Sequence, residues 1–161
     1  MLQLLKKRVD PSELLESRLY NEQSFYGALT KDIKKAQRSV IIESPFLTEK
    51  RVAQFVKLFR KLKKRGVRVR VNSRIPYHHD NKTLEVQAWK AAKLLRSYGV
   101  KVYFYKDMRH RKLVMIDGII LWDGSLNVLS QSHSKEVMRR TVSVQLCQQM
   151  LNFTGAGRWH W

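Results

Sequence analysis

The sequence predicts an α/β fold in which a mixed β-sheet is flanked by helices on both faces. Short apolar segments with strand patterning alternate with amphipathic helical segments through the first two thirds of the chain, and strands follow one another closely afterward. The 161 residues suffice for one domain with a hydrophobic core, and the hydrophobic content of 43% is ordinary for a globular protein. We therefore expect a single layered domain without internal repeats.

The first expected elements are helical. The run Asp10-Pro11-Ser12-Glu13 combines an N-cap, a proline in the first turn and an acidic third position, which predicts a helix over about 11–19. Residues 1–19 are accordingly expected to form a helical N-terminal extension. A second helix is expected over about 23–37, because its apolar residues recur on one face. These residues are Phe25, Leu29, Ile33 and Ala36.

Strands and helices alternate through the middle of the chain. The apolar run 39–46 predicts a buried strand that ends at Pro45, and Thr48 then begins a helix that continues to about Arg65 and ends at Gly66. The remaining expected elements are a strand at 67–71, a loop at 72–80, a helix at 81–98 and strands at 100–106, 112–117, 119–122 and 137–146.

The charge of the chain points to a polyanionic partner. The sequence has 32 Lys and Arg against 13 Asp and Glu, a formal net charge of +19. Such an excess favours nucleic acid first and an anionic membrane surface second, with a merely basic surface as the third reading. The basic face of the helix over about 57–65 is open to the same three readings.

Cysteine content and hydropathy exclude several protein classes. Cys147 is the only cysteine, so neither an intrachain disulfide nor a cysteine-based zinc knuckle can form within one chain. At the N-terminus the basic residues follow the apolar ones, the reverse of a secretory signal, and no apolar run approaches 18 residues. We expect a cytoplasmic protein with no stable membrane insertion.

Polar residues with phosphate chemistry gather in the stretch 110–127. If the stretch begins as a strand, His110 and Lys112 share one face, where the ammonium can neutralise phosphate oxygens while the imidazole attacks phosphorus or transfers a proton. Gly124 allows a close backbone approach, and Ser125 and Asn127 offer hydrogen-bond donors to phosphate oxygens.

Glu136 could accept a hydrogen bond from the second nitrogen of His110 and fix its tautomer. Taken singly, each of these residues has a structural explanation, and Asp117-Gly118 between apolar strands is a strong hairpin-turn signal. Taken together at this spacing, the polar residues of the stretch favour a phosphodiester site that needs no metal or other cofactor.

The pattern His110-x-Lys112-x4-Asp117-x6-Gly124-Ser125-x-Asn127 resembles the HxKx4Dx6GSxN signature of the phospholipase D superfamily and matches it at every fixed position. The order of elements over roughly 20–146 resembles a single-motif member of the bacterial endonuclease type. The resemblance implies a phospholipase D-like catalytic domain over residues 20–150. It also implies two motif copies facing each other across a two-fold axis, and hence a homodimer.

The resemblance further implies a role for each motif residue. His110 of one protomer would attack phosphorus, and His110 of the other would protonate the leaving oxygen and then activate water. Lys112 and Asn127 would bind phosphate oxygens, with Ser125 in support. Asp117 would order the site structurally, and Glu136 would orient the histidine. The apolar residues near the motif would either line the dimer contact or belong to the core; they are Trp122, Leu126 and Val128.

Several residues around the motif could contact substrate. Arg109, Arg111 and Arg139, with the adjacent Arg140, could follow a nucleic-acid backbone or form a solvated rim. The loop at 76–80 contains adjacent histidines, but no third metal ligand is evident, so we read it as a substrate-edge loop in which Tyr77 stacks on a base.

The C-terminal stretch departs from the resemblance. Relatives usually finish with a strand and a helix that packs on the sheet, whereas residues 151–161 predict a short irregular tail. The leading functional hypothesis is a metal-independent nuclease acting on DNA or RNA. The alternatives are a nucleic-acid-binding module that is inactive alone and a lipid enzyme that processes phosphatidyl groups.

Overall fold

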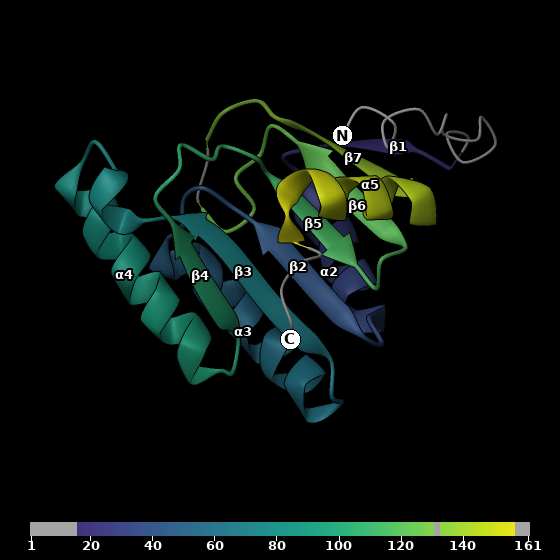
Figure 1. Ribbon diagram of the computed structural model, residues 1–161, viewed down its shortest axis with the longest axis horizontal. Helices are drawn as coiled ribbons and strands as arrows, with labels where there is room; N and C mark the ends of the chain where they lie inside the picture. The colour runs from purple at the N-terminus through teal and green to yellow at the C-terminus, as the bar shows by residue number, and fades with distance from the viewer. Residues whose placement is uncertain (1–15, 131–132, 157–161) are drawn as a thin grey trace.

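A seven-stranded mixed sheet organises the computed structural model, which describes residues 16–130 and 133–156 (Figure 1). The strand order is β1-β7-β6-β5-β2-β3-β4. Strands β2, β3 and β4 run parallel, and the remaining pairs are antiparallel. The strands are β1 (Arg18–Asn21), β2 (Ser39–Glu43), β3 (Arg68–Arg74), β4 (Lys101–Tyr105), β5 (Leu113–Ile116), β6 (Ile120–Gly124) and β7 (Val137–Val142).

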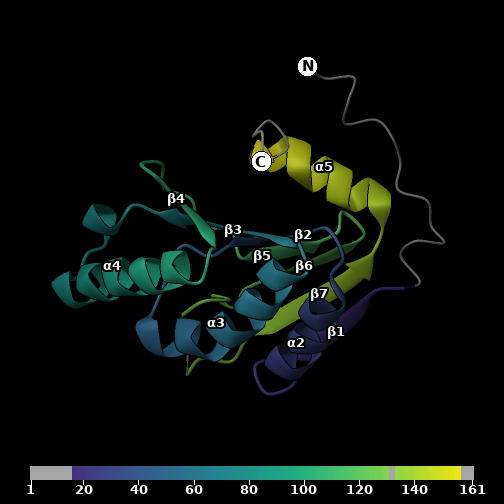
Figure 2. The ribbon, with the colours of Figure 1, turned by 90° about the horizontal axis from the view of Figure 1, so that it is seen from below.

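Helices cover both faces of the sheet, as the sequence predicts. Figure 2 shows α5 on one face and α2, α3 and α4 on the other. Their bounds are α2 (Phe25–Lys35), α3 (Glu49–Lys64), α4 (Lys82–Ser97) and α5 (Val144–Thr154), with a short 3-10 turn, η2, at Pro76–His78. In the parts of the chain that the structure describes, no helix combines the length and the apolarity needed to cross a membrane.

The two faces of the sheet carry separate cores. The larger core joins the sheet to α2, α3 and α4 and includes Phe25, Phe59 and Trp122, all fully buried. The smaller core joins Ile41 and Met115 of the sheet to α5. Alternate residues of β2 and β5 thus face opposite cores, which explains why these strands are apolar throughout.

The N-terminal prediction is wrong where it can be compared with the structure. Most of the helix expected over 11–19 lies outside the described residues, but Arg18 and Leu19 belong to β1 and pair with Arg140 and Arg139 of β7. The edge of the sheet offers these residues backbone partners, and this pairing outweighs the local helix signal.

The C-terminal prediction is also wrong in part. The strand expected to reach residue 146 ends at Val142, and Ser143 caps α5 by accepting a hydrogen bond from the Leu146 amide at 3.0 Å. Helix α5 continues to Thr154, so residues 151–154 are helical and not irregular. The last part of the expected tail, residues 157–161, lies outside the described residues.

The topology gathers the motif residues other than Asp117 at one end of the central strands. Strand β5 is antiparallel to β2, so it begins where β2 ends, and β6 in turn ends and β7 begins at that same end. The carboxyl ends of the parallel strands β2, β3 and β4 meet there too. Ligands of open α/β sheets bind at such an end.

Candidate active site

The structure brings His110 and Lys112 into direct contact just before β5. The Lys112 Nζ atom lies 2.6 Å from Nδ1 and 3.1 Å from Nε2 of the imidazole, and it donates to the His110 carbonyl oxygen at 2.6 Å. The Lys112 side chain is buried, whereas His110 is exposed at the edge of the sheet. The solvent-accessible imidazole of His110 is therefore in direct contact with the buried ammonium group of Lys112.

The electrostatics of this pair favour a neutral imidazole. Burial lowers the pKa of His110, and the positive charges of Lys112 and Arg74 lower it further. Burial also lowers the pKa of Lys112, an effect that Arg74 reinforces and the carboxylate of Glu136 opposes. A neutral imidazole has the free electron pair that a nucleophile needs.

Ser125 and Glu136 are joined to each other beside this pair. The Ser125 hydroxyl donates to Glu136 Oε2 and accepts from the Val137 amide at 3.1 Å. A second hydroxyl, that of Ser134, donates to Glu136 Oε1 at 2.5 Å. The carboxylate thus contacts Ser125 and Ser134, and its link to Lys112 is electrostatic. The expected hydrogen bond from His110 to Glu136 does not appear among the described residues.

Asn127 lies in a turn that the half-buried Tyr26 contacts. The Tyr26 hydroxyl from α2 lies 3.4 Å from the Asn127 carbonyl oxygen and 3.3 Å from that of Val128. Burial raises the pKa of Tyr26 to about 12, so it stays a donor. The Asn127 Oδ1 atom, a hydrogen-bond acceptor, is buried without a partner in the described chain, and a phosphate oxygen would be bound by the Nδ2 donor of the same amide.

Asp117 lies away from the other motif residues, at the far end of β5. It lies five positions after Lys112, a span of about 16 Å along a strand. It forms the β5–β6 turn with Gly118, both at positive φ (57° and 69°), as a type I′ turn requires. Its carboxylate accepts the amides that open β2, those of Gln37, Arg38 and Ser39, at 2.7–2.9 Å. This geometry fits a structural residue, as the resemblance implies.

Asp117 also links the fold to pH. Burial raises its pKa, but the amides of Ser39, Gln37 and Arg38 and the charge of Arg38 outweigh that effect and hold the pKa below its usual value. The stabilisation is therefore complete above the unfolded pKa of about 3.9 and is lost as the pH falls through the lower folded value.

We expect Asp117→Asn to lower the free energy of unfolding at neutral pH by about 1–2 kcal/mol, comparable to the loss of a capping residue. The difference from wild type should narrow as the pH drops below about 4, because the carboxyl of the unfolded wild type then takes up a proton and that of the folded protein does so only at a lower pH. Urea unfolding at several pH values measures it. A difference that is constant with pH would show that the charge of Asp117 contributes nothing.

Gly124 and three apolar residues near the motif serve packing. A Cβ atom at Gly124 would overlap the backbone of Val137 and Met138, so glycine lets β6 and β7 approach. Of the two expected roles for the apolar residues near the motif, a dimer contact or the core, the structure supports the core, because they are buried within the single chain. They are Trp122, Leu126 and Val128.

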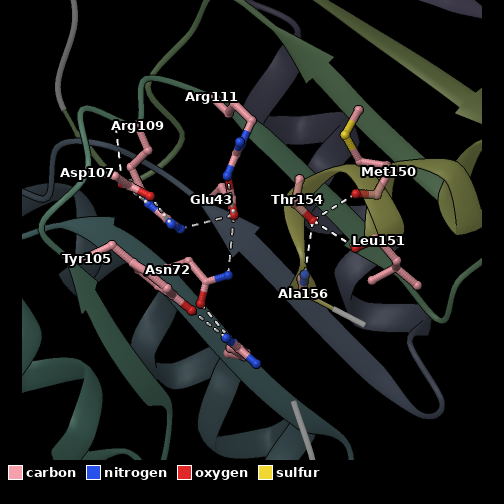
Figure 3. A network of polar contacts seen from close by, with 11 residues as sticks. Glu43, Asn72, Tyr105, Asp107, Arg109, Arg111, Met150, Leu151, Thr154 and Ala156 are labelled. Atoms are coloured by element: carbon pink, nitrogen blue, oxygen red, sulfur yellow. Dashed lines mark hydrogen bonds and ion pairs between the residues drawn. The ribbon is translucent and has the colours of Figure 1, made fainter. Parts of the chain in front are cut away.

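The two arginines that bracket the histidine are held by a buried carboxylate (Figure 3). Glu43, at the end of β2, is 1% exposed and pairs with Arg109 (3.3 Å) and Arg111 (2.7 Å). Arg109 also binds Asp107 at 2.7 Å and lies 3.3 Å from the Tyr105 ring. With a 7% exposed side chain, Arg109 is occupied within the fold, contrary to the expected contact with a nucleic-acid backbone.

The other predicted contacts lie farther from the pair. Arg139 points from β7 to Asp123 and forms an ion pair at 2.8 Å, and Arg140 forms one with Asp32 at 2.7 Å. Tyr77 is 67% exposed, and its ring packs edge-on against Trp89 at 5.4 Å. Tyr77 therefore keeps an exposed part of its ring on which a base could stack, whereas both arginines are already paired with carboxylates.

Sequence reasoning missed Arg74, although its charge reaches the pair. Strand β3 was expected to end at residue 71, but it continues to Arg74, which pairs with Tyr105 of β4. The guanidinium is buried, and its charge lowers the pKa values of His110 and Lys112. The alternation of arginine and valine ends at Val71 and polar residues follow it, so the local pattern gave no signal that the strand continues to Arg74.

The adjacent histidines of the 76–80 loop were considered as possible metal ligands. Within residues 16–130 and 133–156, no three side chains of His, Cys, Asp or Glu lie together in a way that could hold a metal ion. The ring of His79 stacks instead on Phe46, with centroids 5.1 Å apart.

Comparison with known protein families finds one match. The family model described as "Cardiolipin synthase, PLD-like domain" matches residues 29–154, which include every residue of the motif. A comparison with curated protein sequences finds no significant match.

Solved structures share the fold. NucT from Helicobacter pylori superposes with a TM-score of 0.67 at 21% identity, over 85% of this chain and 91% of that one. Nuc from Salmonella typhimurium, a phospholipase D family member, gives 0.69 at 15% identity, over 85% and 90%. Phosphatidylserine synthase from Haemophilus influenzae gives 0.67 at 15% identity, over 89% of this chain but 39% of that one.

Proposed function

Because the chain belongs to the family of phospholipase D-like domains, we propose that it is a metal-independent phosphodiesterase that cleaves nucleic acid through a phosphohistidine on His110. One observation carries the proposal: a solvent-accessible imidazole lies 2.6 Å from a buried lysine ammonium, inside a motif that the family match covers. This pairing supplies a nucleophile and a phosphate-binding charge at one point.

The reaction has two steps. In the first, an imidazole nitrogen of His110 forms a bond to phosphorus while the bond from phosphorus to the leaving oxygen breaks. The Lys112 ammonium and the Asn127 amide bind the phosphate oxygens as negative charge develops. In the second step a water oxygen attacks the phosphohistidine and releases the imidazole. Ser125 and Glu136 support the site, with the carboxylate beside the Lys112 charge.

A single motif provides the nucleophile of this scheme but no separate general acid and base. The leaving oxygen needs a proton, and the attacking water must lose one, so a second imidazole is required. We propose that His110 of a second copy supplies it in a two-fold homodimer, where one patch contacts itself.

A mixing experiment tests the shared site. When wild-type and His110→Ala chains are co-expressed in equal amounts, random pairing makes one quarter of the dimers fully wild type. Activity should therefore fall to one quarter of that of the same total amount of wild type. Activity at one half would mean that each chain works alone and would contradict the shared site. Separately tagged and purified homodimers, mixed without exchange, are the control.

The charge favours nucleic acid as the substrate class. A net charge of +19 suits a polymer whose every unit carries a phosphate. The size of the match agrees: the chain spans nine tenths of NucT and of Nuc but 39% of the phosphatidylserine synthase. The description of the family model keeps a phosphatidyl substrate as the second candidate.

The test is cleavage in excess EDTA. Purified protein is incubated with labelled single- and double-stranded DNA and RNA, and in parallel with vesicles containing phosphatidylglycerol. We expect nucleic acid to be cut and the chelator to have no effect. Release of phosphatidic acid with nucleic acid left intact would favour the lipid enzyme. Binding of nucleic acid with no product in any arm would favour a binding module.

A further inference from the structure

We propose that Arg74 and His79 form a second anion subsite beside the His110–Lys112 pair, and that it binds a phosphate next to the one under attack. The inference rests on the proposed function, because it assumes a substrate with several phosphates in a row. It assigns a role to two residues outside the motif, at the ends of β3 and of the short η2 turn.

Arg74 is a buried guanidinium without a carboxylate. Its residue is 7% exposed, its Nη2 donates to the Arg109 carbonyl oxygen at 3.4 Å, and its Nε is buried without a hydrogen-bond partner. Within the described ranges it forms no ion pair, whereas the neighbouring Arg109 forms two. A buried charge is normally paired, so a ligand anion is the natural counter-charge for Arg74.

His79 repeats this pattern. Both of its ring nitrogens are buried and lack hydrogen-bond partners among residues 16–130 and 133–156. Burial lowers the pKa of His79, and the charge of Arg74 lowers it further against the opposing carboxylates of Asp80 and Glu85. A neutral imidazole ring carries one N–H donor. Unsatisfied buried donors are rare in proteins, and a phosphate oxygen would satisfy this one together with that of Arg74.

Phe46 connects the subsite to the catalytic pair. The Phe46 ring centroid lies 5.1 Å from that of His79, 5.4 Å from Arg74 Cζ and 6.2 Å from the centroid of His110. The three polar groups therefore surround one aromatic ring. A phosphate held by Arg74 and His79 would be a near neighbour of one attacked by His110.

Strand spacing separates the two phosphates. Lys112 precedes β5 and Arg74 ends β3, and these strands flank β2. Adjacent strands are about 4.8 Å apart, so the two backbones are separated by about 10 Å. Consecutive phosphates of a nucleic-acid strand can engage the donors of both strands.

The test compares two substrates that differ in the number of phosphates. A single-stranded oligothymidylate has many, and bis(4-nitrophenyl) phosphate has one. In EDTA, Arg74→Gln should lower kcat/KM for the oligothymidylate by about 10- to 100-fold, the loss of one charge-assisted hydrogen bond. This loss should exceed that for the small substrate at least tenfold. His79→Phe keeps the stacking on Phe46 and should show the same selectivity.

Arg96→Gln is the matched control. Arg96 also donates from Nη2 to a backbone carbonyl, that of Val102 at 3.0 Å, and lies over a phenylalanine, Phe104, at 5.5 Å. It is exposed on α4, and its loss should change neither substrate's kcat/KM. Thermal unfolding of each variant verifies that it is folded.

The outcomes separate the subsite from the proposed function. Equal losses on both substrates for Arg74→Gln, or none on either, would overturn the subsite while the enzyme remains. If wild type cleaves neither substrate, the proposed function fails. The affinity for oligothymidylate then tests whether the subsite exists. In the His110→Ala background, Arg74→Gln should then weaken oligothymidylate binding, measured by fluorescence anisotropy, by about tenfold or more. An unchanged Kd would overturn it.

Discussion

Replacing His110 by alanine should reduce cleavage of nucleic acid by about ten-thousandfold or more, because removal of a nucleophile leaves only the binding and electrostatic contributions. The exposed position of His110 makes the loss specific: its side chain is not part of either core, so stability should change little. Binding should persist, since the charge of Lys112 and the remainder of the basic surface are kept.

The measurement combines a single-turnover assay in EDTA with mass spectrometry of the stopped reaction. Wild type should carry on His110 a phosphoryl group to which one part of the cleaved strand is still esterified, and His110→Ala should carry no such adduct. His78→Ala, which removes an exposed imidazole outside the motif, is the control and should cleave normally. Cleavage by His110→Ala at the wild-type rate, or an adduct on another residue, would contradict the proposed nucleophile.

The fold class could be predicted because the hydrophobic pattern is explicit where the sheet is central. The residues 40–42 are apolar on both faces of β2, and the helix after this strand begins and ends within a residue or two of the limits set by Thr48 and Gly66. Errors fall at the two ends of the chain. There, β1 depends on pairing with a strand more than a hundred residues later, which no local pattern reveals.

The helix α5 is a different kind of miss. Ser143 and the apolar spacing of Leu146, Met150 and Leu151 are a helix signal, but the strand before it was extended too far. The boundary was therefore wrong because two apolar patterns meet there, and strand and helix periodicity cannot be separated over so few residues.

The motif residues were accessible to sequence reasoning because their spacing is fixed within one stretch. Arg74, His79 and Glu43 were not, since each reaches the His110 region from a different strand or loop. The same limit applies to the flanking arginines. Their charges were visible in the sequence, but the carboxylate that occupies them comes from β2, more than sixty residues earlier.

Glu43 should be the most sensitive position outside the motif. Its carboxylate is 1% exposed and accepts hydrogen bonds from Arg109, Arg111 and Asn72 (Figure 3). Glu43→Ala removes the ion-pair partner of Arg111 and leaves Arg109, whose side chain is only 7% exposed, with Asp107 as its remaining carboxylate. Removing one partner of a buried pair costs about 3–5 kcal/mol, which is a large share of the stability of a domain this size.

Urea unfolding should register this loss. Asp123→Ala is the matched control, because it breaks the exposed Arg139–Asp123 pair, with side chains 52% and 26% exposed, and should cost at most about 1 kcal/mol. Glu43→Ala combined with Arg111→Ala should destabilise less than the sum of the two, since the second change removes a charge that the first leaves unpaired. Additive losses would mean that the two side chains do not interact in solution.

Glu43 should also act on the reaction through position, because the two arginines that it holds are the immediate neighbours of His110 in the chain. Glu43→Gln keeps an acceptor but loses the charge, so the segment around His110 should be less well fixed. At a temperature where this variant is fully folded, we expect kcat to fall while oligonucleotide binding, measured in the His110→Ala background, stays near wild type. A loss of stability with an unchanged kcat would reduce Glu43 to a purely structural role.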